Sequence, residues 1–288
     1  MDSSWERHII ADPMHGGMPV AAFYHPPGWQ AGSQVMWNPA EKQSPVRIIA
    51  HAGPPDGSLT LEFLPSQAYA WPPMPLTMPG QNADGVIMMQ PMPAADAVVR
   101  MIVPAFRARC DNLQVISAEQ VNMPAPSDPR IPPGAAQVFK ARVRIRYSFK
   151  GVEREEEFRA EQTIIHGGMT FWQLHNVASF SAPAGALDAN LSIFDHVEQS
   201  WFENEQWKTL LQQVVSQGLA AANAQINAQI EAGRMQTERF IQESNARMQR
   251  NADYVARQGA RIAAMEGGPY LGTTKTFSAS DMLGGDRG

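Results

Sequence analysis

The chain lacks several features that would place it in a functional class at once. Its 288 residues include a single cysteine, Cys110, so no internal disulfide can form and a reducing compartment is favoured. No apolar run approaches the roughly 20 residues that a membrane-spanning helix needs. Acidic residues outnumber basic ones by 28 to 23, which argues against nucleic acid as the main partner. The apolar content of 44% and the charged content of 18% are typical of a soluble globular protein.

The N-terminus also lacks the pattern of a secretory signal. Residues 1–7, MDSSWER, contain no basic segment followed by an apolar one. We therefore expect a cytoplasmic protein, while a secreted or periplasmic form that has already been processed stays open.

Proline is missing between Ala184 and Gly268, although the chain contains 23 prolines. That stretch is rich in Ala, Gln, Asn, Arg and Glu, which favour helices, whereas proline breaks a helix interior. The sequence predicts an α+β domain over residues 1–203, an antiparallel sheet sandwiched by helices. A long helical segment over 204–268 and a flexible tail over 269–288 follow it.

A charged hairpin is the clearest local pattern of the first part. From Gln137 to Ile165 apolar and charged residues alternate around Lys150-Gly151, a two-residue turn. This turn makes paired residue numbers add to 301, so that Arg144 faces Glu157. We expect a solvated sheet face whose charges neutralise each other; the alternative is a cationic strip that binds a ligand.

Three further expectations concern the strands and the helix around this hairpin. Residues 65–93, rich in proline and methionine, form an irregular segment, after which a helix runs from Pro93 until Pro104 ends its pattern. In the last strand, residues 169–180, one apolar face is formed by Trp172, Leu174, Ala178 and Phe180. We expect Phe63, Val143 and Trp172 to be buried, because each lies on the apolar side of an alternating strand.

The helical half carries a stripe of small and aliphatic residues at helical spacing. A helix from Asn204 to Ala264 would be roughly 90 Å long at ~1.5 Å per residue. It must therefore protrude as an assembly arm, bend back along its own domain or pair with another chain; a membrane-surface helix is a further alternative. The stripe is a poor coiled-coil seam, because Gly233 and Thr237 interrupt it.

The sequence contains no nucleotide, zinc-protease or paired-cysteine motif. His51, His166 and His175 are the candidates for a metal or acid–base site, but no orienting group or third ligand is indicated. Cys110 has no histidine partner in the sequence, as is typical of an inert thiol. We therefore predict no catalytic, cofactor-binding or metal-binding residues and no cofactor.

The order of elements and turns resembles the PsbP/Mog1-like sandwich. The residues that carry the resemblance lie between about 8 and 205: Pro27-Gly28-Trp29, Val35-Met36-Trp37, Pro55-Asp56-Gly57-Ser58, Pro93 to Phe106 and the strands from Val138 to Phe180. The resemblance implies an antiparallel sheet with helices on its faces. It also implies a role as a non-catalytic adaptor, assembly factor or small-GTPase binder, and it carries over no functional residue.

We therefore expect a non-enzymatic binding or assembly protein, an adaptor or scaffold that acts through the sandwich surface and the long helix. Its partner is another protein or a second copy, bound through residues 204–268. One alternative is a hydrolase with a pocket under the 65–93 segment that uses His51, His166 or His175. The other is a secreted effector-associated protein.

Overall fold

The computed structural model describes residues 5–72, 79–83, 85–124 and 134–265. The chain divides into two compact units, Met1–Ala222 and Asn223–Gly288. The strands are β1 Glu6–Asp12, β2 Met18–His25, β3 Gln30–Trp37, β4 Val46–Gly53, β5 Thr60–Leu64, β6 Gln67–Trp71, β7 Asn82–Ala83, β8 Val86–Met88, β9 Asp111–Met123, β10 Ala136–Phe149, β11 Val152–Ile165, β12 Thr170–Pro183 and β13 Phe202–Glu203. The helices are a 3₁₀ turn Pro13–His15, α1 Ala94–Ala97, a π-helical turn Val98–Ile102, α2 Val103–Arg107, α3 Leu187–Gln199 and α4 Glu205–Met265.

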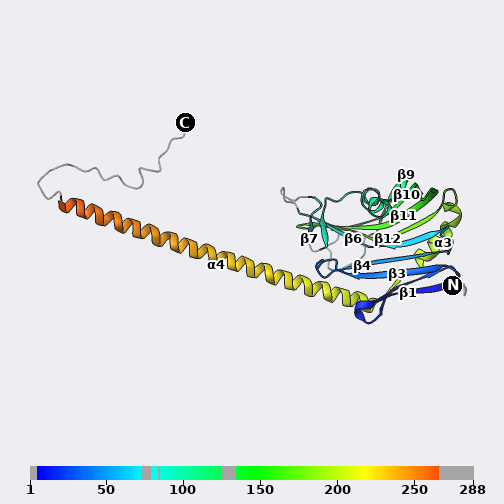
Figure 1. The fold of residues 1–288 in the computed structure, drawn as a ribbon, viewed down its shortest axis with the longest axis horizontal. Coiled ribbons are helices and arrows are strands. Elements are labelled where there is room, and N and C mark those ends of the chain that lie inside the picture. The colour runs from blue at the N-terminus through cyan, green and yellow to red at the C-terminus, as the bar shows by residue number, and fades with distance from the viewer. Residues whose placement is uncertain (1–4, 73–78, 84, 125–133, 266–288) are drawn as a thin grey trace, which may run out of the picture. The chain divides into compact units, whose positions relative to one another are not determined.

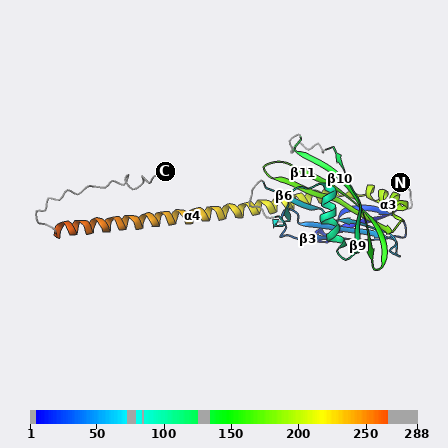
Figure 2. The same ribbon diagram turned by 90° about the horizontal axis from the view of Figure 1, so that it is seen from above.

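The described residues of the first unit form two sheets. The larger has the strand order β3-β4-β5-β12-β11-β10-β9, and β6 to β8 attach beside β12. Its pairings are antiparallel except that of β6 with β8. The smaller sheet has the order β1-β2-β13. Figure 1 shows β9 to β12 as one layer and β1 apart from it, and the twist of the long strands is visible in Figure 2.

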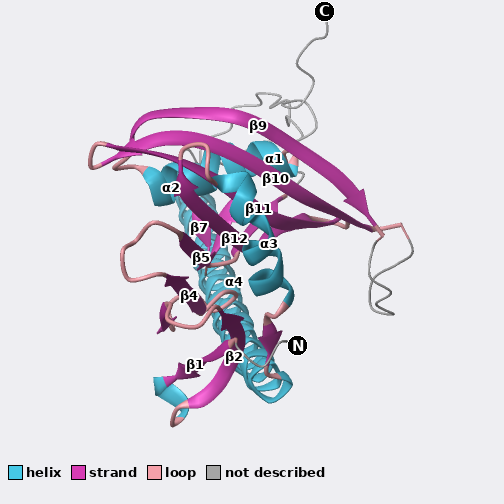
Figure 3. Cartoon of the chain, turned by 90° about the vertical axis from the view of Figure 1, so that its right-hand side faces the viewer, coloured by secondary structure: helices cyan, strands magenta, loops and turns pink. Residues whose placement is uncertain are grey.

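Apolar side chains fill a separate core on each face of the larger sheet. One core joins β10, β11 and the first half of β12 to the α1–α2 helix, with Trp172 and Phe158 among its buried residues. The other joins the smaller sheet, α3 and the start of α4 to β4, β5 and the second half of β12. Figure 3 shows α1 and α2 beneath the long strands and α3 at the side. The predicted α+β sandwich is therefore confirmed.

The structure confirms the register of the charged hairpin. Phe149 pairs with Val152 and Arg144 pairs with Glu157, so paired numbers add to 301. Lys150 and Gly151 have φ values of 50° and 78°, and this left-handed pair makes the two-residue turn. Phe63 and Val143 are buried, as predicted, and so is Trp172.

The single apolar face predicted for the last strand is wrong. Trp172 and Leu174 lie in the core between the sheet and α1, whereas Ala178 and Phe180 lie in the core between the sheet and α3. The register between β11 and β12 shifts between Arg159 and Glu161, since β12 carries one extra residue there. Asn176, with φ of 50°, lies within this bulge. Because of the extra residue, the side chains on either side of the bulge that would share a face by strict alternation point to opposite faces of the sheet. A strictly alternating pattern does not predict this change.

Two expectations about proline are also corrected. Residues 65–93 are not irregular throughout, because they include β6, β7 and β8; residues 73–78 and 84 lie outside the described part. Pro104 does not end the helix, which continues to Arg107. In the preceding π-helical turn the Val103 amide donates to the carbonyl of Val98, five residues back. Pro104 then lies in the first turn of α2, where a missing amide hydrogen is tolerated.

The long C-terminal helix is present as α4 and is divided between the two units. Its first residues, through Ala222, belong to the first unit, where Trp207 is buried and Leu211 packs against the core. The structure thus divides the chain later than the predicted boundary after Glu203. In the second unit the described residues are those of α4 alone. The predicted tail, residues 269–288, lies outside the described part.

Candidate functional site

A cleft of about 930 Å³ lies in the first unit. It is lined by parts of β2, β4, β5, β10, β11 and β12, by the end of α3 and by the start of α4. Phe63 and Trp201 meet in it with ring centroids 4.4 Å apart. Phe202, 63% exposed, lines it as well. The cleft therefore offers an aromatic surface large enough for a small molecule or a peptide side chain.

Charged groups also line the cleft, and most of them are paired. The Lys140 ammonium lies 3.4 Å from a carboxylate oxygen of Glu198. At the start of α4, Lys208 lies 3.3 Å from a carboxylate oxygen of Glu203. Glu161 accepts a 3.0 Å hydrogen bond from the side-chain amide of Asn176. The two lysines of the cleft are therefore each paired with a carboxylate of the same chain.

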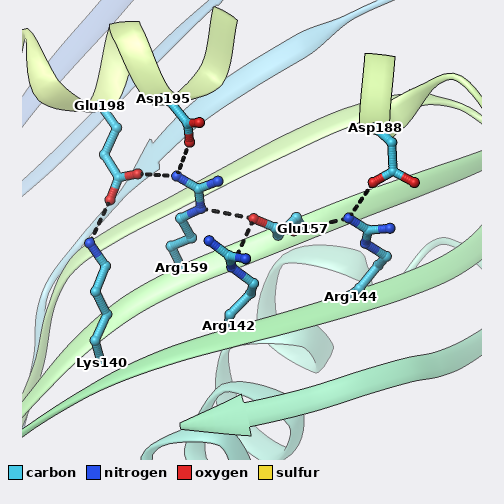
Figure 4. A network of polar contacts seen from close by, with 8 residues as sticks. All are labelled: Lys140, Arg142, Arg144, Glu157, Arg159, Asp188, Asp195 and Glu198. Carbon is cyan, nitrogen blue, oxygen red and sulfur yellow. Dashed lines mark hydrogen bonds and ion pairs between the residues drawn. The ribbon is translucent and has the colours of Figure 1, made fainter. Parts of the chain in front are cut away.

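The cleft continues into an ionic network between the long strands and α3 (Figure 4). Arg159 donates to Glu157 at 2.8 Å and to Asp195 and Glu198 at 2.6 Å each. Its guanidinium carbon also lies 4.2 Å from the ring centroid of Phe194. Burial would lower the pKa of Arg159, but the hydrogen bonds that it donates to Asp195 and Glu198 raise it, so the side chain stays charged.

The expected solvated face is found at Arg142 and Arg146, whose side chains are 56% and 49% exposed, but not at Glu157 and Arg159. The side chain of Glu157 is 1% exposed and that of Arg159 is 7% exposed, because α3 covers them. Arg144 reaches both Glu157, at 3.3 Å, and Asp188 of α3, at 2.7 Å. The predicted Arg144–Glu157 pair is present, but the acidic side of α3 adds counter-charges that the hairpin alone does not contain. No ligand is needed to neutralise the row.

A second ionic cluster lies on the opposite face of β11. Arg107, at the end of α2, donates to Glu156, with its Nε 2.7 Å from the carboxylate, and also pairs with Glu62. Burial acts to lower the pKa of Arg107, but Glu156 and Glu62 raise it more. Glu156 is fully buried. The cluster ties α2 to β5 and β11, and nothing in the spacing of these three residues indicated it.

Asp12 forms a third buried polar centre, where the start of α4 meets the first strands. The carboxylate accepts hydrogen bonds from the indole nitrogens of Trp37 and Trp207 at 3.0 and 2.9 Å, and from the imidazole of His15 at 2.8 Å. The Met14 amide is a fourth donor, at 2.9 Å. Burial acts to raise the pKa of Asp12, but these hydrogen bonds lower it overall. Asp12 thereby fixes the first turn of α4 to the domain.

The three candidate histidines are not brought together at the cleft. His51 is exposed on β4 opposite Glu62, and His166 follows β11. His175 on β12 hydrogen-bonds to the Thr163 hydroxyl at 2.9 Å, and burial lowers its pKa. None of the three lines the cleft. Within the described ranges no group of three His, Cys, Asp or Glu side chains is placed to hold a metal ion.

The remaining sequence candidates lie as follows. Cys110 is half-buried after α2, and burial raises its thiol pKa, with a smaller opposing effect of Arg107. The 65–93 segment packs on the core, because Met89 and Met92 accept hydrogen bonds through their carbonyls from Trp172 and Gln162. Among the helices that the structure describes, none is long and apolar enough to cross a bilayer.

Comparison with known proteins assigns no family. No protein-family model matches the chain, and no curated protein matches it. One similar solved structure is PA94 from Pseudomonas aeruginosa, described as a putative regulator. Its sequence is 10% identical and its TM-score is 0.25, and the match covers 67% of this chain and 95% of that chain. Another is LpqN of Mycobacterium tuberculosis, described as involved in cell envelope biogenesis. Its sequence is 12% identical and its TM-score is 0.26, and the match covers 70% of this chain and 92% of that chain. Similarities this low carry no argument about function, and the α+β class rests on the elements described above.

Proposed function

We propose that this chain is a non-enzymatic binding and assembly protein, an adaptor or scaffold. It acts through the surface of its sandwich and through the second half of α4. Its partner there is another protein or a second copy of itself. The PsbP/Mog1-like sandwich, with its adaptors and assembly factors, remains part of this proposal for the first unit.

The observation that carries the proposal is the exposure of large apolar side chains on α4 beyond Ala222. Ile230 and Met248 are more than 60% exposed and Ile241 is 51% exposed. Their spacing of 11 and 7 residues puts them on one side of the helix. Phe240, 70% exposed, lies beside this side. A helix of this composition is marginal in water by itself, so packing against another chain is what would stabilise it.

The proposal is tested by polar substitution of that side in the full chain. Ile230, Ile241 and Met248 are changed together to glutamine, which preserves helix propensity. The control changes Gln229, Gln236 and Glu243, also on α4, to alanine. Mass is measured by light scattering after size exclusion, and helicity by circular dichroism. We expect the first variant to lose self-association or capture of the partner, and the control to keep it. A native chain that is a stable monomer, with full helicity and no captured partner, would contradict the proposal.

A second candidate function is capture of a ligand in the cleft, supported by its volume and by the Phe63–Trp201 pair. Tryptophan fluorescence provides a readout, because Trp201 lines the cleft and its contribution to the signal should change on binding. A Phe63→Ala variant should weaken that binding while leaving the mass of the chain unchanged. An effector-associated role would use the same two surfaces. The hydrolase alternative needs a nucleophile beside a base. The described residues include two hydroxyl–imidazole contacts, His8 with Ser33 and His175 with Thr163, each at 2.9 Å, but none of these residues lines the cleft.

A further inference from the structure

β9 is an edge strand of the larger sheet. Among the described strands it pairs with β10 alone, so its outer edge offers unpaired backbone amides and carbonyls. It runs for 13 residues, and all but one of them are exposed. An open edge of this kind is a template for another strand.

This edge carries little of the protection that usually prevents pairing. From Asn112 to Met123 the only charged residue is Glu119, and there is no lysine or proline. The only features that discourage pairing with another strand lie in the first half of β9. There the register against β10 shifts around residue 116 and again before it. Bulges of this kind bend a strand away from a partner. The stretch Ser117–Met123 pairs regularly with β10, so pairing should use this stretch.

The side chains of that stretch complement themselves. Ser117, Glu119, Val121 and Met123 share one face of the sheet, since they alternate in the regular register. An antiparallel copy related by a twofold axis at Val121 would place Val121 opposite Val121 and Met123 opposite Glu119. The four apolar side chains of the two copies would then form one continuous row.

The other face and the charges agree with the same register. There the twofold axis at Val121 places Gln120 opposite Asn122, an amide facing an amide. The two Glu119 carboxylates are kept four residues apart along the paired strands, and each faces Arg142 within its own chain. A foreign strand would have to match this pattern of apolar, amide and acidic positions, whereas a second copy does so by symmetry.

We propose that the outer edge of β9 pairs with β9 of a second copy, antiparallel and centred on Val121. The exposed fraction of Val121, 57%, is the largest among the apolar residues of the large sheet that are identified as exposed, and the pairing would bury it. This surface is separate from α4, so the two proposals can fail independently.

Cysteine cross-linking tests the register. Directly opposite residues have Cα atoms about 4.5–5.5 Å apart, within the reach of a disulfide. In a Cys110→Ser background, Val121→Cys is compared with Val152→Cys, which places a cysteine at another exposed strand valine (52%). Mild oxidation should link the first variant into dimers and leave the second unlinked. Equal cross-linking of the two variants would overturn the proposal.

A charge variant tests the energetics without an oxidant. Val121→Lys puts like charges opposite each other at the axis and should shift the mass of the full chain from associated toward single chains. Val152→Lys should leave the mass unchanged. Cross-linking through Val121→Cys should persist when Ile230, Ile241 and Met248 are glutamine, which separates this contact from association through α4. An unchanged mass for Val121→Lys, with association persisting, would also overturn the pairing.

Discussion

Removing Trp207 should destabilise the first unit strongly, although it lies only three residues into α4. The residue is 4% exposed, and its indole donates to the buried carboxylate of Asp12. Its ring lies edge-on to Trp37, with centroids 6.5 Å apart. Trp207→Ala should cost about 3–5 kcal/mol of unfolding free energy, because a large core side chain is lost and little can fill its place.

A conservative variant separates the packing from the hydrogen bond. Trp207→Phe keeps most of the bulk and removes only the indole donor. It should cost about 1.5 kcal/mol, the lower end for a hydrogen bond to a charged group, because Asp12 keeps its other donors. Both values come from urea unfolding of the full chain, followed by circular dichroism. Phe202→Ala is the matched control and should cost less than about 0.5 kcal/mol, because Phe202 is exposed.

The same residue decides where the first unit ends. A chain that stops after Ala222 should fold, whereas one that stops after Glu203 should lose most of its stability with Trp207. If Trp207→Ala costs less than about 1 kcal/mol, the start of α4 is not part of the core and the boundary after Glu203 is right.

Three other perturbations test the remaining buried contacts. Trp172→Ala should cost about 3–5 kcal/mol in urea unfolding, because the indole is buried and donates to the carbonyl of Met89. Arg159→Met should cost about 3–5 kcal/mol in the same assay, since it leaves Glu157 buried beside fewer cations, and the loss should shrink when Glu157 becomes Gln. Burial lowers the pKa of His8 and His175, so the folded state favours their neutral forms. The contribution of these two histidines to stability should therefore be constant above about pH 7.5 and be lost as the pH drops through about 6.5, with a shallower fall in the His8→Gln, His175→Gln variant.

The sequence predicted the parts of the fold that follow from local chemistry. The alternation and the Lys150-Gly151 turn fix the hairpin register, because a slip by one residue would move every apolar side chain to the wrong face. The absence of proline between Ala184 and Gly268 predicted the long helix α4. These patterns need no knowledge of what packs against them.

What the sequence did not predict depends on contacts between distant segments. The burial of Glu157 depends on α3, 31 residues after it at Asp188, and the centre at Asp12 joins residues 195 positions apart. The bulge near Asn176 moved half of β12 to the other core, and no residue pattern marks it. The cleft arises where the end of α3 and the start of α4 meet the sheet, so neither the cleft nor the Phe63–Trp201 contact could be found from spacing alone.

Hydrogen–deuterium exchange of α4 at several protein concentrations tests the assembly proposal most directly. If residues 223–265 are held by another copy, their amides should be protected at high concentration and lose that protection on dilution, as the mass falls. The amides of β10 and β11, within the core of the first unit, should be protected throughout and serve as the internal control. Equal protection of 223–265 at every concentration in a chain that remains a monomer, or none at any concentration, would contradict assembly of copies through this helix.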